Sequence, residues 1–73
     1  MDLEKEKKWY TDAVRSFLIL NYGMTSEVAD EAMTRYMLKE KLDEFPEIQL
    51  HYSIESAIWE MENQGCIPKS TFE

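Results

Sequence analysis

The sequence has few of the residues that cross-link small domains. Its 73 residues include one cysteine, Cys66, and one histidine, His51. A single cysteine excludes a disulfide within the chain, and one residue of each kind does not supply the several ligands that a transition-metal site requires. We therefore expect no disulfide framework, no metal and no cofactor. A reducing, cytoplasmic location fits this cysteine usage.

The sequence also lacks the patterns that accompany catalysis. His51 is the only imidazole, and the hydroxyl groups nearest to it in the chain belong to its immediate neighbours, Tyr52 and Ser53. Neither a glycine-rich phosphate loop nor a nucleophile elbow is present. We therefore predict that the protein is not an enzyme.

Long apolar runs and an excess of positive charge are absent as well. The longest apolar run, from Phe17 to Leu20, is far shorter than the roughly 20 residues of a membrane span, and no signal-peptide pattern follows the charged segment 2–8. Eight basic residues against 15 acidic ones give a net charge of −7. Such a charge repels nucleic-acid phosphates and anionic lipid. We expect neither membrane insertion nor direct nucleic-acid binding.

What the chain does contain is apolar material at helical spacing. Apolar residues make up 44% of it, and only two glycines and two prolines interrupt it. The first predicted helix spans residues 3–21, with Asp2 as its N-cap and Gly23 supplying the left-handed residue after its end. Seven apolar residues of this helix fall within half of its circumference, which predicts contact with two other helices. They are Trp9, Tyr10, Ala13, Val14, Phe17, Leu18 and Leu20, and only Ile19 lies outside the arc.

A second helix is predicted over residues 26–44. Thr25 or Ser26 opens it, and Pro46 disfavours a helical conformation at Phe45. This helix carries two apolar stripes on opposite sides, which one neighbour cannot bury together. The first stripe consists of Val28, Ala29, Ala32, Met33, Tyr36 and Met37, and the second consists of Leu38, Leu42 and Phe45.

Segment 47–52 is ambiguous, because its apolar residues alternate with polar ones at the period of a strand. Since no partner strand is available, we interpret it as an irregular connector, with a one-turn helix beginning at Pro46 as the alternative. Ser53 caps a third helix over residues 54–64, and an irregular tail follows from Cys66 to Glu73. The predicted fold is all-α. It is a single three-helix domain over residues 1–73, in which a helical hairpin is joined to a third helix.

The functional prediction depends on the apolar residues that a small core leaves over. Trp59 projects away from the apolar stripe of the third helix, with Glu55 and Glu62 beside it. Its cover is the tail through Ile67 and Phe72, the second stripe of the preceding helix, or another chain. We therefore predict a protein-binding surface formed by Leu38, Leu42, Phe45 and Trp59. The protein would be a small acidic interaction module or regulator, docking on a protein partner or on a second copy as a homodimer.

An alternative function follows from the charge distribution. Residues 47–73 contain five acids and one base, Lys69. Carboxylates on the second and third helices could imitate nucleic-acid phosphates and block the binding site of a basic protein. The residues of this predicted mimic are Glu27, Asp30, Glu31, Glu40, Asp43, Glu44, Glu55 and Glu62.

Overall fold

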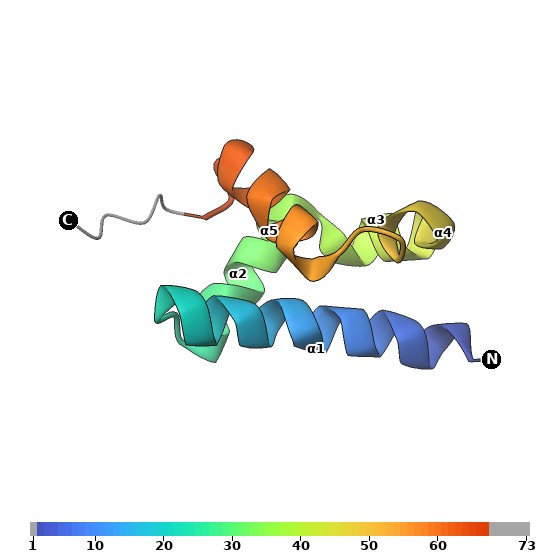
Figure 1. The fold of residues 1–73 in the computed structure, drawn as a ribbon, viewed down its shortest axis with the longest axis horizontal. Coiled ribbons are helices and arrows are strands. Elements are labelled where there is room, and N and C mark those ends of the chain that lie inside the picture. The colour runs from blue at the N-terminus through green and yellow to red at the C-terminus, as the bar shows by residue number, and fades with distance from the viewer. Residues whose placement is uncertain (1, 68–73) are drawn as a thin grey trace.

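The chain folds into α-helices joined by short turns. The computed structural model describes residues 2–67, and within this range it contains five helices and no strand (Figure 1). The helices are α1 (Leu3–Tyr22), α2 (Ser26–Tyr36), α3 (Leu38–Glu44), α4 (Pro46–Gln49) and α5 (Ile54–Asn63). The predicted all-α class is therefore confirmed. The three-helix count is wrong, because the predicted second helix is divided and the connector contains a helix of its own.

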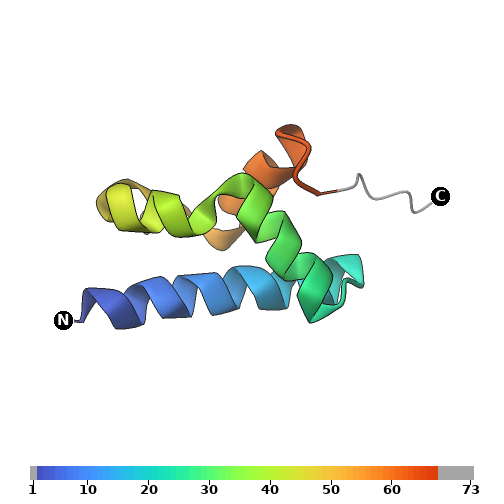
Figure 2. The ribbon, with the colours of Figure 1, turned by 180° about the vertical axis from the view of Figure 1, so that it is seen from behind.

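The ends of α1 follow the local signals of the sequence. The Asp2 side chain accepts a hydrogen bond from the Glu4 backbone N–H at 3.0 Å, which satisfies one of the free donors at the start of the helix. Gly23 closes the other end in the left-handed conformation, with φ at 68°. Thr25 then caps α2 by accepting from the Val28 N–H at 3.2 Å. The chain reverses between these caps, but α2 rises at a steep angle to α1, so the two helices do not form the side-by-side hairpin that the sequence predicted (Figure 2).

The predicted helix 26–44 is broken at Met37. This residue adopts a left-handed conformation, with φ at 63°, and it ends α2 and begins α3 at once. The turn redirects α3 so that it lies back along the N-terminal half of α1 (Figure 2). The bend solves the problem of the two apolar stripes, because Leu38 and Leu42 now face the same core as Met33 and Tyr36.

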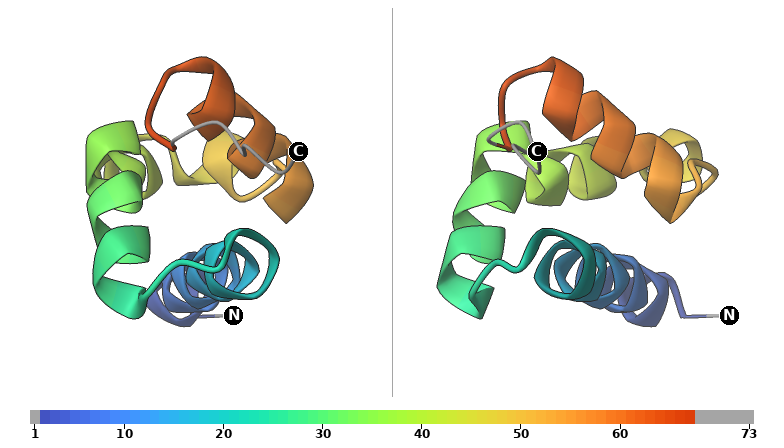
Figure 3. Two further views of the ribbon diagram at one scale, coloured as in Figure 1. Left: turned by 90° about the vertical axis from the view of Figure 1, so that its left-hand side faces the viewer. Right: turned by 60° about the vertical axis from the view of Figure 1, so that its left-hand side comes forward.

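Segment 47–52 adopts the alternative considered for it. Pro46 occupies the first turn of α4, where its missing N–H is not needed, and a turn at Leu50 and His51 followed by a bend at Tyr52 leads to Ser53. Ser53 caps α5 by accepting from the Ser56 N–H at 3.1 Å. The views in Figure 3 show α5 crossing above α1, with α2 standing beside both.

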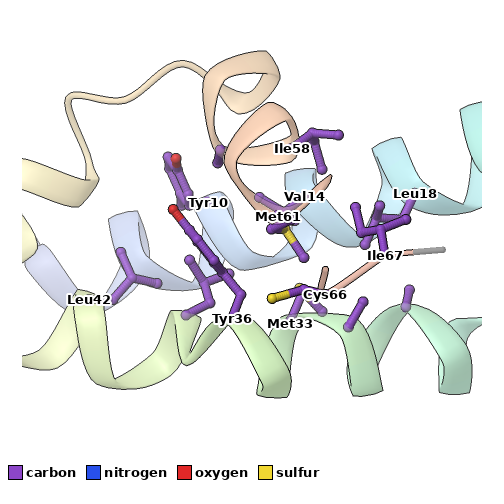
Figure 4. Packing of buried hydrophobic residues seen from close by; sticks show 14 residues of the cluster. Tyr10, Val14, Leu18, Met33, Tyr36, Leu42, Ile58, Met61, Cys66 and Ile67 are labelled. Atoms are coloured by element: carbon purple, nitrogen blue, oxygen red, sulfur yellow. The ribbon is translucent and has the colours of Figure 1, made fainter. Parts of the chain in front are cut away.

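The core lies between α1, α2, α3 and α5 (Figure 4). Tyr10, Val14 and Leu18 form the contribution of α1. Ala57, Ile58 and Met61 enter from α5, and Cys66 and Ile67 close the cluster after it. Ile67, named as part of one alternative cover for Trp59, thus packs into the core, whereas Phe72 lies outside the described residues. Within the described part of the chain, no helix is both long and apolar enough to cross a membrane.

The prediction for the apolar arc of α1 is only partly right. Tyr10, Val14 and Leu18 are buried as expected, but Trp9 and Leu20 are exposed. Ile19, which the helical wheel placed outside the arc, packs at the edge of the core. The reason is that the arc is wider than the faces of the helices that cover α1. The outer edge of the arc is left in solvent.

Candidate protein-docking surface

The structure divides the four residues of the predicted docking surface. Leu38 and Leu42 are each only 2% exposed and belong to the core. They cannot form part of a docking surface in this fold, and this part of the prediction is corrected. The physical reason is the bend at Met37, which turns the second stripe inward.

Phe45 and Trp59 remain on the surface, at 56% and 66% exposure, but they belong to different elements. Phe45 lies at the junction of α3 and α4, whereas Trp59 projects from the middle of α5. The tail residue Ile67 is buried in the core and leaves the indole exposed. Leu38 and Leu42 line the floor of a groove between α1 and the α2–α3 pair, whereas Phe45 lines a separate hollow, so the structure does not bring the four predicted residues together.

That hollow is a groove of about 730 Å³ beside α4, here called the α4 groove. Its walls come from the first turn of α1 and from residues 44–51, which Figure 1 shows at the same end of the molecule. The groove holds three large exposed apolar side chains: Leu3, Phe45 and Ile48 at 44%, 56% and 59% exposure. Its lining residues are Leu3, Glu6, Glu44, Phe45, Pro46, Glu47, Ile48, Leu50 and His51.

The backbone at Phe45 sets the shape of the groove. Its φ of −133° and ψ of 55° interrupt the helix between α3 and α4, and its N–H still donates to the Lys41 carbonyl at 2.8 Å. Pro46 favours this non-helical conformation, because its ring disfavours helical angles in the preceding residue. The Phe45 carbonyl then accepts from the Gln49 N–H at 3.0 Å, which starts α4. Phe45 and Ile48 are thus held on one short corner.

A buried polar contact fixes this corner to the rest of the fold. Gln49 is the one buried polar residue of the described chain, at 4% exposure. Its side-chain amide donates to the Tyr10 hydroxyl of α1 at 3.3 Å. A buried amide without a partner would destabilise the fold, so this contact favours one position of α4. The α4 groove is therefore a built feature of the fold.

The charges in the α4 groove all have one sign. Glu6, Glu44 and Glu47 line it, and no lysine or arginine does. Among residues 2–67, none of these three carboxylates takes part in an ion pair. Apolar side chains framed by free carboxylates favour a partner that carries positive charge around an apolar contact.

A second groove, of about 510 Å³, runs between α1 and the α2–α3 pair and has a different character. Its charges neutralise one another across the groove. The Lys7 ammonium lies 3.2 Å from Asp43 of α3, and the Arg15 guanidinium lies 2.8 Å from Asp30 of α2. The Asp43 carboxylate is the main cause of the raised pKa of Lys7, and Asp30 likewise raises the pKa of Arg15. These pairs join helices and leave little free charge for a ligand.

The same pairs bear on the residues proposed from the sequence as a nucleic-acid mimic. Asp30 and Asp43 are held by Arg15 and Lys7, and Glu62 accepts a hydrogen bond from the Tyr22 hydroxyl at 3.0 Å. Three of the eight carboxylates are thus engaged inside the chain.

A buried tyrosine in the core is also hydrogen-bonded to a carboxylate. The Tyr36 hydroxyl of α2 donates to Glu60 of α5. Burial is the main cause of the raised pKa of Tyr36, and the Glu60 carboxylate raises it further. The ammonium of Lys41 lies 4.8 Å from the centre of the same ring. Tyr36 therefore ties α2 to α5 and has no free polar group to offer a substrate.

The sequence reasoning missed Leu3 and Ile48 as surface residues. Ile48 was part of the alternating pattern, and a one-turn helix at Pro46 places its side chain outward while Gln49 turns inward. The alternative interpretation of segment 47–52, a one-turn helix beginning at Pro46, already contained this signal for Ile48. No signal in the sequence placed Leu3 near Phe45, because their proximity depends on the bend at Met37.

The candidate metal-ligating side chains of residues 2–67 are not gathered in one place. No group of three or more His, Cys, Asp or Glu side chains is placed to hold a metal ion in that range. Cys66 is free and buried, and His51 is exposed at the edge of the α4 groove. Comparison with protein-family models, with curated proteins and with solved structures finds no match to this chain.

Proposed function

We propose that the protein is a non-catalytic interaction module that docks on a partner through the α4 groove. The observation that carries this proposal is the exposure of Leu3, Phe45 and Ile48 around a hollow that a buried hydrogen bond fixes in place. Solvent-exposed apolar side chains that are gathered in one concave place are typical of protein interfaces. Phe45 is an aromatic anchor of the kind that dominates binding energy.

The partner is a basic protein segment with at least one apolar side chain to insert. Glu6, Glu44 and Glu47 frame the groove, so lysine or arginine residues beside the inserted side chain would meet carboxylates. The charge of the whole chain, −7, acts in the same direction by attracting a basic segment over longer distances.

A symmetric contact between two α4 grooves is disfavoured by the same charges. A twofold contact places identical surfaces together. It would bring Glu6, Glu44 and Glu47 of one copy against the same three residues of the other, which is repulsive. The groove therefore favours a different protein as its occupant over a second copy.

A titration followed by ¹⁵N–¹H correlation spectra tests this proposal. The probe is a synthetic helical peptide with leucine on one face and lysine on the other, and the control peptide carries glutamate in place of lysine. We expect the lysine peptide to shift the amide signals of Leu3, Phe45, Ile48 and His51 most strongly, and the glutamate peptide to leave them unchanged. Shifts spread evenly over the acidic surface would refute a specific site.

The substitution Ile48→Ser separates groove binding from general charge attraction. It removes an exposed side chain and no charge, so the fold and the net charge stay the same. Trp59→Ser is the matched control, because Trp59 is slightly more exposed than Ile48 and lies outside the groove. The proposal requires that Ile48→Ser weakens binding of the lysine peptide and that Trp59→Ser does not.

A further inference from the structure

The turn between α2 and α3 consists of a single residue, Met37. It is the one non-glycine residue among residues 2–67 with a positive φ, at 63°. L-residues with a side chain disfavour this conformation, and glycine adopts it freely. Met37 is 55% exposed, so packing of its side chain compensates for little of the strain. The bent form of the chain is therefore held together by contacts elsewhere.

The local sequence favours a straight helix through this turn. Residues 34–41 contain neither glycine nor proline, and Met, Leu, Lys and Glu are good helix formers. In the bent form α3 begins without a side-chain cap. A continuous helix would give the first N–H groups of α3 the carbonyl groups of α2 as partners. Local conformation thus favours straightening, and tertiary contacts oppose it.

Those opposing contacts all join two halves of the chain, one before Met37 and one after it. Tyr22 donates to Glu62, Tyr36 to Glu60 and Gln49 to Tyr10, and Lys7 pairs with Asp43. The core cluster is likewise shared between α1 and α2 on one side and α3 and α5 on the other (Figure 4). A second copy can supply every one of these contacts. The half after Met37 in one chain then packs on the half before Met37 in the other, and the same residues meet.

Geometry also favours a second copy in the straight form. On a continuous helix, Leu38 and Leu42 point about 120° away from Ala32 and Tyr36. The α2 helix would keep its contact with the α1 helix of its own chain. Leu38 and Leu42 would face away from it, where only the α1 helix of another chain can bury them.

We infer that Met37 is the hinge of a domain-swapped dimer, in which α3, α4 and α5 of each copy pack on α1 and α2 of the other. A short strained hinge is the usual site of such an exchange. This inference rests on Met37 and is independent of the α4 groove, whose residues do not line the hinge. The partner is a second copy of this chain, and the buried surface is the existing core.

Substitution of Met37 tests the inference in two directions. Met37→Gly removes the strain of the bent form and weakens a straight helix, so it should favour the monomer. Met37→Ala keeps the strain and strengthens the straight helix, so it should favour the dimer. The difference between alanine and glycine in a helix changes the association constant about fivefold for each hinge. Because a dimer has two hinges, the association constants of Met37→Ala and Met37→Gly should differ by roughly 30-fold.

The measurement is the mass by light scattering after refolding at high and at low protein concentration. The expected dimer fraction after concentrated refolding is largest for Met37→Ala, intermediate for the natural chain and smallest for Met37→Gly. Circular dichroism should show the same helical content for all three. Absence of dimer in Met37→Ala, or equal dimer in the Ala and Gly variants, would overturn the inference.

Two further measurements distinguish exchange from a contact between surfaces. Ile48→Glu adds charge to the α4 groove and should leave the swapped dimer intact, whereas loss of the dimer in this variant would contradict exchange. In a dimer refolded from a mixture of isotope-labelled and unlabelled chains, filtered NMR spectra should show contacts between α1 of one chain and α5 of the other. If these contacts occur only within one chain, the dimer is not swapped.

Discussion

The side-chain amide of Gln49 donates a hydrogen bond of 3.3 Å to the hydroxyl of Tyr10, a residue 39 positions earlier in the chain. This contact connects a helix of four residues, α4, to the longest helix of the fold. Since α4 is too short to be stable alone, its position depends on such contacts. The exposed corner that carries Phe45 and Ile48 is therefore held in one position relative to the core.

Replacing Gln49 by leucine should destabilise the protein by about 1–2 kcal/mol, because the Tyr10 hydroxyl would then be buried without its partner. The change should also raise the hydrogen-exchange rates of α4 more than those of α5. Urea unfolding and exchange measured by NMR check both effects. Gln64→Leu is the control, since Gln64 is exposed, and it should change neither quantity much.

Two leucines of α1 offer a matched pair for measuring how much the core contributes. Leu18 is fully buried, whereas Leu20 is 81% exposed on the same helix. Leu18→Ala should lower the free energy of unfolding by about 2–5 kcal/mol, which is enough to unfold much of a domain of this size. Leu20→Ala should change it by less than about 0.5 kcal/mol. Comparable losses from the two substitutions would mean that the face of α1 is misassigned.

Gly23 ends α1 with φ at 68°, and no atom lies within 4 Å of the position that a Cβ would occupy. The cost of Gly23→Ala should therefore be conformational only, about 1 kcal/mol. Asparagine tolerates the left-handed conformation better, so Gly23→Asn should cost less. Thermal unfolding of the two variants gives this order, and a much larger loss for alanine would indicate a steric contact that the structure does not show.

The stability of the fold should decrease in alkaline solution because of Tyr36. Burial and the Glu60 carboxylate raise the pKa of Tyr36 above its ordinary value of 10.0. The folded chain then keeps the phenol proton while the unfolded chain loses it, so stability is full below pH 10 and falls as the pH rises above that value.

Tyr36→Phe should reduce this alkaline loss, at the expense of about 1–3 kcal/mol at neutral pH, because the hydrogen bond to the Glu60 carboxylate is removed. Burial also raises the pKa values of Tyr10 and Tyr22, so part of the pH dependence should remain in the variant. Urea midpoints measured from neutral pH to above pH 10 test the prediction. An unchanged alkaline slope in Tyr36→Phe would show that Tyr36 is not the group responsible.

Local features of the fold could be predicted from the sequence because they depend on neighbouring residues. Asp2, Gly23 and Ser53 act as the helix boundaries that their side chains or conformational freedom indicate. The apolar spacing of α5 likewise identified Ala57, Ile58 and Met61 as its buried side. These signals need no knowledge of where other segments lie.

The break at Met37 could not be predicted in this way. Residues 34–41 read as a continuous helix, and it is the burial of Leu38 and Leu42 together with the other contacts across the bend that makes the left-handed turn favourable. The predicted docking surface failed at the same point, since those two leucines were assigned to the outside. The two apolar stripes on opposite sides of one predicted helix indicated that the helix bends or that a second chain covers one of them.

The most direct test of the proposed docking function is a calorimetric comparison of peptide affinity at two surface positions. Ile48→Ser in the α4 groove and Leu20→Ser on the outer face of α1 each remove one exposed aliphatic side chain without changing charge. Burial of one such side chain contributes about 1.5–3 kcal/mol, so Ile48→Ser should weaken binding of the lysine-and-leucine peptide by more than about 10-fold, and Leu20→Ser should leave it unchanged. Equal affinities for the two variants would contradict docking in the α4 groove.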